Sequence, residues 1–261
     1  MIDLKTITHL IIDMDGVLYR GDEPLPGLQA FVAFLRERPI PFILATNNST
    51  RTPRQYADKL ARMGVAVAPH EILTSGQATA RVLAQEYPPG TRIHVFGSPA
   101  LREAIAEAGF VLADEGVAAV VASLDPDLSY ARLKRATLLI RGGARFFATN
   151  LDPTQPTEEG LVPGTGALIA ALQAASGVSP QAVGKPEPTM FLQAMAQLGA
   201  HPGTTATIGD RLDTDILGGQ RAGLTTICVL SGSTGRAEAE AYGPDLIFED
   251  IEALRKAWQS L

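Results

Sequence analysis

The sequence predicts an α/β protein with a doubly wound parallel sheet, because apolar runs alternate with amphipathic helical segments along most of the chain. The apolar runs are nearly continuous, which is typical of parallel strands that helices cover on both faces. We identify the strand candidates as residues 9–14, 41–47, 92–97, 118–124, 144–150, 205–210, 225–230 and 246–250.

Three of the intervening segments carry helix signals. Residues 28–38 (LQAFVAFLRER) have apolar side chains at helical spacing. Residues 52–64 begin with Thr52 and Pro53, which suit an N-cap and a first helical turn, and they end at Gly64. Residues 186–199 likewise begin with proline and end with glycine, so we expect a helix in each segment.

Two stretches rich in glycine, serine or proline, residues 74–77 (TSGQ) and 176–188, are candidate domain boundaries. The chain between them has strands and helices of its own. If both stretches are hinges, the middle of the chain is an insertion into a domain built from the two ends. We therefore predict one domain from residues 1–76 and 183–261, and a smaller inserted α/β domain at residues 77–182.

Composition excludes several classes of protein. The 261 residues carry a formal net charge of −6, which argues against a general nucleic-acid binder but allows anionic substrates, since a metal ion can invert local charge. Cys228 is the single cysteine, so no intrachain disulfide can form and a reducing, cytoplasmic location is expected. The N-terminus shows no signal-peptide pattern, and the apolar run 117–124 is too short to cross a bilayer as a helix, so no membrane partner is expected.

Polar side chains follow the predicted strands where a ligand site is expected. In an open α/β sheet, ligands gather beyond the carboxyl ends of the strands. Taken singly, each of these residues would be an ordinary turn, cap or surface residue. Together they supply a nucleophile, hydrogen-bond donors, a cation and metal-binding carboxylates: Asp13, Asp15, Thr46, Asn47, Asn48, Lys185, Asp210, Asp213 and Asp215.

Four segments resemble, in order and spacing, the signature segments of the haloacid dehalogenase superfamily: DMDGVLYRG (13–21), ATNNS (45–49), GKPEP (184–188) and GDRLDTD (209–215). The strings DGVLYRG, PLPG and TNNST, with the large middle insertion, look more specifically like the 4-nitrophenyl phosphatase, or NagD-like, subfamily, which includes pyridoxal phosphate and phosphoglycolate phosphatases. The resemblance covers nearly the whole chain. It implies a Rossmann-like catalytic core, an inserted α/β cap, and hydrolysis of small phosphorylated metabolites.

The resemblance also assigns roles to the acids. Asp13 would attack phosphorus and form an aspartyl-phosphate. Mg²⁺ would be bound by Asp13, the backbone carbonyl of Asp15 and Asp210, with Asp215 orienting the waters of the metal. The side chain of Asp15 would protonate the leaving alcohol and then activate water. Because dehalogenases lack this second acid in the family pattern, Asp15 points to phosphoryl transfer. Gly16 would let the backbone turn back sharply.

Four further residues would bind the substrate. Thr46 would donate a hydrogen bond to a phosphate oxygen, and the amide of Asn47 would join it, with Asn48 as a further contact. Lys185 would place a positive charge between Asp13 and the phosphate, a role that suits the compact ammonium group.

For several other residues a structural role is the expected one. We expect Asp213 to cap the helix that begins near Leu212, Arg211 to pair with a local carboxylate, and Cys228 to be a core thiol. The histidines are scattered without ligand spacing, so we expect no zinc site. Four residues of the insertion could face the substrate but are left out of the catalytic set: Asp125, Asn150, Asp152 and Gln155. Of these, Asn150 and Asp152 more often mark turns.

Three alternatives remain. A phosphotransferase or mutase would use an alcohol in place of water, and a phosphometabolite-binding module would keep the site without turnover. A dinucleotide-binding domain fits less well, because no G-x-G-x-x-G follows the first strand. Dimers formed through the cap are known in the subfamily, so the resemblance also allows a homodimer.

Overall fold

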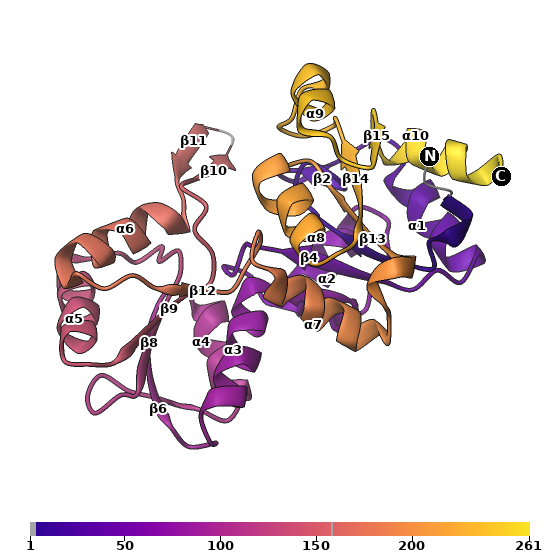
Figure 1. Ribbon diagram of the computed structural model, residues 1–261. Coiled ribbons are helices and arrows are strands. Elements are labelled where there is room, and N and C mark those ends of the chain that lie inside the picture. The colour runs from indigo at the N-terminus through magenta and orange to yellow at the C-terminus, as the bar shows by residue number, and fades with distance from the viewer. Residues whose placement is uncertain (1–3, 158) are drawn as a thin grey trace. The chain divides into compact units, whose positions relative to one another are not determined.

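A computed structural model describes residues 4–157 and 159–261, which divide into two compact units (Figure 1). The first unit contains the described residues up to Thr46 together with Pro53–Leu73 and Lys185–Leu261. The second unit contains Asn47–Thr52 and Thr74–Gly184, so it interrupts the first unit in the sequence.

The first unit is built on a six-stranded sheet of order β15-β14-β13-β1-β4-β5. The strand pairings among β1, β4, β13, β14 and β15 are all parallel. Numbered by their appearance within this unit, the strands lie in the order 3-2-1-4-5-6, which is the doubly wound arrangement predicted. The strand bounds are β1 (His9–Ile12), β4 (Phe42–Thr46), β5 (Ile72–Thr74), β13 (Thr205–Gly209), β14 (Thr225–Val229) and β15 (Leu246–Phe248).

Helices cover both faces of this sheet because alternate strand residues are apolar on each side. Leu10 and Ile12 of β1 belong to one core cluster with Phe31, Leu60 and Trp258, which lie on three helices. These helices are α1 (Leu28–Glu37), α2 (Pro53–Arg62) and α10 (Ile251–Gln259). The opposite face contacts α7 (Pro188–Leu198) and α8 (Leu217–Arg221).

Close helix–sheet approach on that second face requires a glycine. A Cβ on Gly219 of α8 would overlap the Thr207 methyl group of β13 and lie 3.0 Å from that of Thr226 in β14. The predicted helices at 28–38, 52–64 and 186–199 are confirmed as α1, α2 and α7. Gly199 ends α7 in the left-handed conformation, with φ 64°, as the sequence pattern indicates.

The first unit also contains short elements: η1 (Leu4–Thr6), β2 (Tyr19–Arg20), β3 (Glu23–Pro24), η2 (Pro69–Glu71), η3 (Pro202–Thr204), the π-helical turn η4 (Leu212–Ile216) and α9 (Arg236–Tyr242). The strands β2 and β3 have two residues each and pair antiparallel. They are too short to be recognised from alternating hydrophobicity in the sequence. The hairpin they form directly follows the DMDG segment and therefore shapes the turn after β1.

The second unit has a five-stranded parallel sheet of order β12-β9-β8-β6-β7. Its strands are β6 (Arg92–Phe96), β7 (Val111–Leu112), β8 (Ala119–Ala122), β9 (Arg145–Ala148) and β12 (Gln181–Ala182). Helices α5 (Tyr130–Arg141) and α6 (Thr165–Ser176) pack on one face through Ile140, Ile169 and Leu172. Figure 1 shows α3 (Ser75–Glu86) and α4 (Pro99–Glu107) on the other side.

The TSGQ segment opens a helix. Thr74 Oγ1 accepts a hydrogen bond from the Gln77 amide at 3.2 Å, and Gln77 Oε1 accepts one from the Thr74 amide at 3.2 Å. This reciprocal capping box satisfies two backbone donors at the start of α3. The second unit also carries an antiparallel hairpin of β10 (Thr154–Thr157) and β11 (Gly160–Pro163). Among the described helices, none has the length and apolarity needed to span a bilayer.

Candidate active site

The candidate site lies at the topological switch point of the first sheet, between β1 and β13. Asp13 directly follows β1, and Asp210 directly follows β13. The Asp13 amide donates to the Ile208 carbonyl oxygen at 2.8 Å, which continues the ladder between the two strands. In doubly wound sheets, ligands usually bind beyond the carboxyl ends of the strands at this point, where chain connections leave the sheet in opposite directions. The strand order thus places both acids where ligands usually bind.

Three carboxylates gather at this position. One oxygen from each of Asp13, Asp210 and Asp215 lies within 4.8 Å of the others. Asp210 and Asp215 are 4% and 1% exposed, so two of the acids are almost completely removed from water. Burial of several like charges is costly unless cations compensate them.

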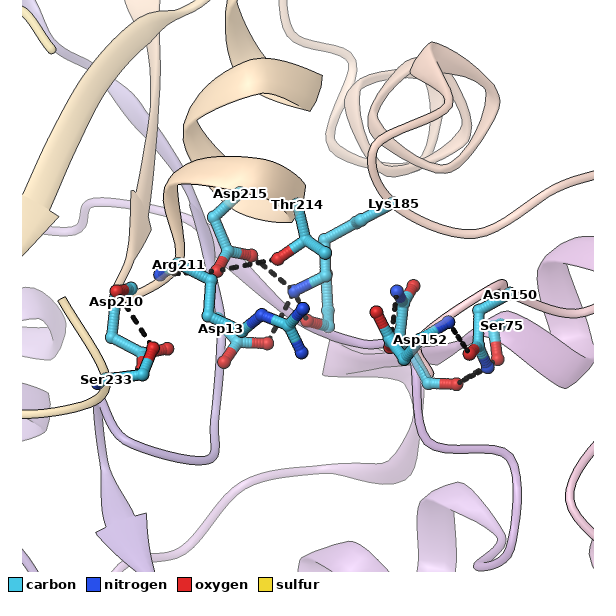
Figure 2. Close-up of polar contacts among 12 residues, drawn as sticks. Asp13, Ser75, Asn150, Asp152, Lys185, Asp210, Arg211, Thr214, Asp215 and Ser233 are labelled. Carbon is cyan, nitrogen blue, oxygen red and sulfur yellow. Dashed lines mark hydrogen bonds and ion pairs between the residues drawn. The ribbon is translucent and has the colours of Figure 1, made fainter. Parts of the chain in front are cut away.

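Lys185 supplies one such cation. Its Nζ donates to Asp13 Oδ1 at 2.5 Å, to Asp215 Oδ1 at 2.6 Å and to the Ala45 carbonyl oxygen at 3.0 Å. An ammonium group has three protons, and these contacts match them. Figure 2 shows the amine directed between the two carboxylates. Lys185 therefore links the ends of β1 and β4 to η4.

Burial and charge shift the pKa values of this cluster. Burial raises the pKa of Asp13 well above its ordinary value, and Asp215 and Asp210 add to this effect against the opposing Lys185. Burial and Asp215 also raise the pKa of Asp210 to about 6, although two hydrogen bonds from Ser233 act in the other direction. Burial alone would lower the pKa of Lys185, but Asp13 and Asp215 raise it overall. The lysine is thus held as a cation, whereas the raised pKa values of Asp13 and Asp210 show that negative charge on these acids is only partly compensated.

The turn after β1 brings Gly16, the residue after Asp15, directly against Asp210. Gly16 has φ +78°, as the sequence predicts for a sharp reversal, and its amide donates to the Tyr19 carbonyl oxygen at 2.8 Å. A Cβ at Gly16 would lie 2.7 Å from Asp210 Cγ, so a side chain here would collide with the acid. Asp15 forms an isolated backbone bridge with Tyr19.

The predicted phosphate-binding residues divide between the two units. Thr46 ends β4 in the first unit and is 4% exposed, whereas Asn47 and Asn48 belong to the second unit. The Asn47 side chain donates from Nδ2 to Asp152 Oδ2 at 3.0 Å. Asn48 Oδ1 accepts from the amide and hydroxyl of Thr50 at 2.9 and 2.7 Å, which is a local turn contact.

The prediction that Asp213 caps a helix is wrong, whereas the prediction that Arg211 pairs with a local carboxylate is confirmed. Arg211 precedes η4, and its guanidinium donates to both carboxylate oxygens of Asp213 at 3.0 and 2.8 Å. The Asp213 side chain therefore pairs with this local cation and does not cap the helical turn. Arg211 pairs with a carboxylate as expected. Cys228 is fully buried in β14, and burial raises the pKa of its thiol to about 11, in agreement with a core role.

A loop after β14 contacts the site and was missed in the sequence analysis. The amide and hydroxyl of Ser233 both donate to Asp210 Oδ2, at 2.8 and 2.9 Å. Ser231 Oγ donates to the Gly16 carbonyl oxygen at 2.7 Å. The signal that could have found this loop is its sequence, LSGSTG (230–235), which directly follows a buried parallel strand neighbouring β13.

The second sheet also has a topological switch point, between β6 and β8. The polar side chains near this point contact one another. Ser98 Oγ donates to the Ser49 carbonyl oxygen at 2.8 Å, and the hydroxyls of Ser49 and Ser123 share a short hydrogen bond. Asp125 Oδ2 lies 2.7 Å from Arg132 Nε, with the Asp125 side chain fully buried.

Asn150 and Asp152, which the sequence analysis left out of the catalytic set, both hydrogen-bond Asn47. Asn150 Nδ2 donates to the Asn47 carbonyl oxygen at 2.8 Å, and Ser75 Oγ donates to the same oxygen at 2.5 Å. Asp152 accepts from the Asn47 side chain, as described above, while Gln155 lies on β10. This part of the second unit therefore fixes both the backbone and the side chain of Asn47.

Comparison with known proteins decides the family. Residues 10–111 match the haloacid dehalogenase-like hydrolase family, and residues 182–254 match a related hydrolase-like family. An acid sugar phosphatase of Staphylococcus aureus (strain USA300) is 40% identical over 251 residues, which cover 95% of this chain and 96% of the relative. The chain belongs to the haloacid dehalogenase-like hydrolases.

Solved structures of this family extend the likeness to the whole fold. The 4-nitrophenylphosphatase of Thermotoga maritima is 36% identical, with a TM-score of 0.94 over 98% of this chain and 99% of the other. A glycerol phosphate phosphatase of Mycobacterium tuberculosis, solved in complex with magnesium, is 34% identical, with a TM-score of 0.89 over 96% of this chain and 77% of the other. The predicted superfamily and NagD-like subfamily are thus confirmed, and the protein is a haloacid dehalogenase-type phosphatase, a phosphoric monoester hydrolase.

Proposed function

We propose that the protein is a Mg²⁺-dependent phosphatase of small-molecule phosphomonoesters that works through an aspartyl-phosphate on Asp13. The observation that carries this proposal is the cluster at the switch point: three buried or half-buried carboxylates within 4.8 Å and the ammonium of Lys185 between two of them. Such a cluster combines a carboxylate nucleophile with groups suited to a hard cation.

The residues present fit a magnesium ion. All candidate donors are oxygens, which Mg²⁺ prefers, and one lysine does not balance three carboxylates once these are ionised. Asp13, the backbone carbonyl of Asp15 and Asp210 would hold the ion, while Asp215 would orient its waters. When bound, Mg²⁺ would neutralise charge on the phosphoryl oxygens and allow them to approach Asp13.

Asp13 and Asp15 would carry out the bond changes. An oxygen of Asp13 attacks phosphorus, and the bond from phosphorus to the ester oxygen breaks. Asp15 gives its proton to the departing alcohol oxygen. In the second half, Asp15 takes a proton from water as the water oxygen attacks phosphorus, which releases phosphate and restores the Asp13 carboxylate.

Lys185 and the residues after β4 would bind the phosphate. Lys185 holds Asp13 Oδ1 at 2.5 Å, so it fixes the nucleophile and brings positive charge beside the incoming phosphoryl group. We propose that Thr46, Asn47 and Asn48 donate to the phosphoryl oxygens. The contacts of Asn150 and Ser75 with the Asn47 carbonyl oxygen would then hold this segment in place.

The substrate class follows from the relatives. Their names describe an acid sugar phosphatase, a nitrophenylphosphatase and a glycerol phosphate phosphatase. We therefore propose a small phosphorylated metabolite such as a sugar phosphate as the substrate. In this proposal, residues 1–76 and 183–261 form the catalytic domain and residues 77–182 an inserted cap that selects the leaving group. A cytoplasmic location and a homodimer formed through the cap belong to the same proposal.

Two measurements test the proposal. Hydrolysis of 4-nitrophenyl phosphate should require Mg²⁺ and should stop when a chelator removes it. Borohydride added during turnover should reduce the acyl-phosphate and convert residue 13 to homoserine, which peptide mass spectrometry detects. Turnover without homoserine at residue 13 would contradict the aspartyl-phosphate. Transfer of the phosphoryl group to an added alcohol in preference to water would favour a phosphotransferase.

A further inference from the structure

The carboxylate of Asp210 is held through only one of its oxygens. Both the amide and the hydroxyl of Ser233 donate to Oδ2, at 2.8 and 2.9 Å (Figure 2). Within residues 4–157 and 159–261, no hydrogen bond reaches Asp210 Oδ1. Two donors on one oxygen and none on the other make the two sides of this buried carboxylate chemically different.

Two glycines restrict how this carboxylate can turn. A Cβ at Gly16 would lie 2.7 Å from Asp210 Oδ2, and a Cβ at Gly232 would overlap the same oxygen. The two backbones therefore pack directly against the acid from the turn after β1 and from the loop after β14. This close packing leaves the carboxylate little room to change its orientation.

The loop that carries Ser233 is anchored to the same turn that carries Asp15. Ser231 Oγ donates to the Gly16 carbonyl oxygen at 2.7 Å. Arg20 Nη2 donates to the Ser231 carbonyl oxygen. At its start, the Leu230 amide donates to the Phe248 carbonyl oxygen at 3.0 Å. Contacts of Leu230 and Ser231, the two residues before Gly232, thus fix the position from which Ser233 reaches Asp210.

We propose that Ser233 is a positioning residue that occupies Oδ2 of Asp210 and so presents Oδ1 to the divalent cation. This inference rests on the proposed function, since it assumes that Asp210 binds Mg²⁺. The physical reason is that groups which hydrogen-bond a ligating carboxylate orient it, and their loss commonly weakens metal affinity by about 10- to 100-fold. Ser233 itself contacts Asp210 and would not touch the substrate.

Removal of the hydroxyl tests this role. Ser233→Ala deletes one of the two donors and keeps the backbone amide. We expect its dissociation constant for Mg²⁺, measured by calorimetric titration of chelator-treated protein, to rise by about tenfold. Ser233→Thr keeps a hydroxyl and should bind Mg²⁺ as the parent does. Ser260→Ala is the matched control, because Ser260 is exposed and its hydroxyl donates to Ala257 at the end of α10.

Kinetics provide a second readout. For Ser233→Ala, the Mg²⁺ concentration giving half-maximal hydrolysis of 4-nitrophenyl phosphate should rise by the same factor, while kcat at saturating Mg²⁺ should stay near the parent value. A purely structural role would lower the melting temperature in chelator and leave the Mg²⁺ dissociation constant unchanged, and this result would overturn the inference.

The two proposals fail in different ways. If the parent protein binds no Mg²⁺, the proposed function is wrong, and the inference falls with it. If the parent binds Mg²⁺ and Ser233→Ala binds it equally well, only the inference is wrong. Should Ser233→Ala not fold, Ser233→Cys replaces the hydroxyl by a weak thiol donor, and its Mg²⁺ dissociation constant decides the question in the same way.

Discussion

Each of the two units has a topological switch point in its parallel sheet, but the side chains at the two points differ. Each has a parallel sheet in which the direction of chain connection reverses between two neighbouring strands: β1 and β13 in the first unit, β6 and β8 in the second. At the first switch point, carboxylates and one lysine gather within a few ångströms. At the second, the polar groups are neutral serines or a paired Asp125 and Arg132.

The difference shows that strand order creates the place for a site, and side chains decide its use. At the second switch point, the Ser49 carbonyl oxygen accepts from Ser98 and the Ser49 hydroxyl hydrogen-bonds that of Ser123, so these serines bind one another. At the first, three acids gather beside Lys185, and in the proposed function a divalent cation compensates their remaining negative charge. The comparison predicts that equivalent Asp→Asn substitutions will lower activity in the first unit and stability in the second.

The largest expected effect is that of Asp13→Asn. An amide cannot form the acyl-phosphate, so kcat for 4-nitrophenyl phosphate should fall by roughly 10⁴- to 10⁶-fold, as when other catalytic nucleophiles are removed. The fold should persist, because Lys185 keeps Asp215 and the Ala45 carbonyl oxygen as acceptors. Steady-state kinetics and circular dichroism check both points, with Asp58→Asn as an exposed control on α2. Turnover near the parent rate would exclude Asp13 as the nucleophile.

Asp15→Asn should come next and should depend on the leaving group. Loss of a general acid costs about 10²- to 10⁴-fold for a poor leaving group such as a sugar alcohol. Nitrophenolate leaves readily without a proton, so its release should suffer less. The measurement is kcat/KM for both substrate types in the variant and the parent. Equal losses for the two substrates would argue against proton donation by Asp15.

Much of the fold and part of the site could be predicted from the sequence because their signals are local. The strand candidate at 9–14 contains Asp13 next to its end, and the candidate at 205–210 ends in Asp210, so this pattern is visible without any long-range contact. The structure then pairs these strands directly. The short strands β2 and β7 carry two residues each and could not be recognised, since a period of two needs a longer run.

The missed contacts depend on distant parts of the chain. Ser233 and Asp210 are 23 residues apart and meet because β13 and β14 are neighbours in the sheet. Asn150 and Asn47 are 103 residues apart, and each ends an Ala-Thr-Asn string. Asp213 looked like a helix cap because Asp is common there, but Arg211 two residues earlier provides a stronger partner.

Asp125→Asn tests the other side of the comparison. Its carboxylate is fully buried, pairs with Arg132 at 2.7 Å and accepts from the Asp127 amide at 3.1 Å. Loss of the charge should lower the free energy of unfolding by about 1–3 kcal/mol, because a partly buried guanidinium loses its partner. Urea unfolding gives the measurement, with Asp127→Asn as the exposed control. A variant as stable as the parent would mean that this pair contributes nothing to the second unit.

The smallest effect should come from His94 in β6. Burial lowers its pKa below the ordinary value of about 6.5, despite its contacts with the Ala113 carbonyl oxygen and Asp114. As the pH falls below about 6.5, His94 becomes protonated more readily in the unfolded chain than in the folded one. The free energy of unfolding therefore decreases as the pH falls. Well above pH 6.5, His94 is neutral in both the folded and the unfolded chain, so it causes no loss of stability there.

Calorimetric melting at about pH 7.5 and about pH 5.5, on either side of the ordinary histidine pKa, measures this effect. The parent should lose more thermal stability between these values than His94→Gln does. His201→Gln, at an exposed histidine, should behave as the parent does. An identical loss in the parent and in His94→Gln would show that another group causes the pH dependence.

The charge count at the first switch point has a consequence for the sequence of events in turnover. When Asp13, Asp210 and Asp215 are ionised, one lysine leaves two negative charges in a confined space, the complement of a single dication. A phosphate ester arriving first would meet a repulsive field. If the proposed function is correct, binding should therefore be ordered, with magnesium entering before the ester, and inorganic phosphate should inhibit only after magnesium has bound.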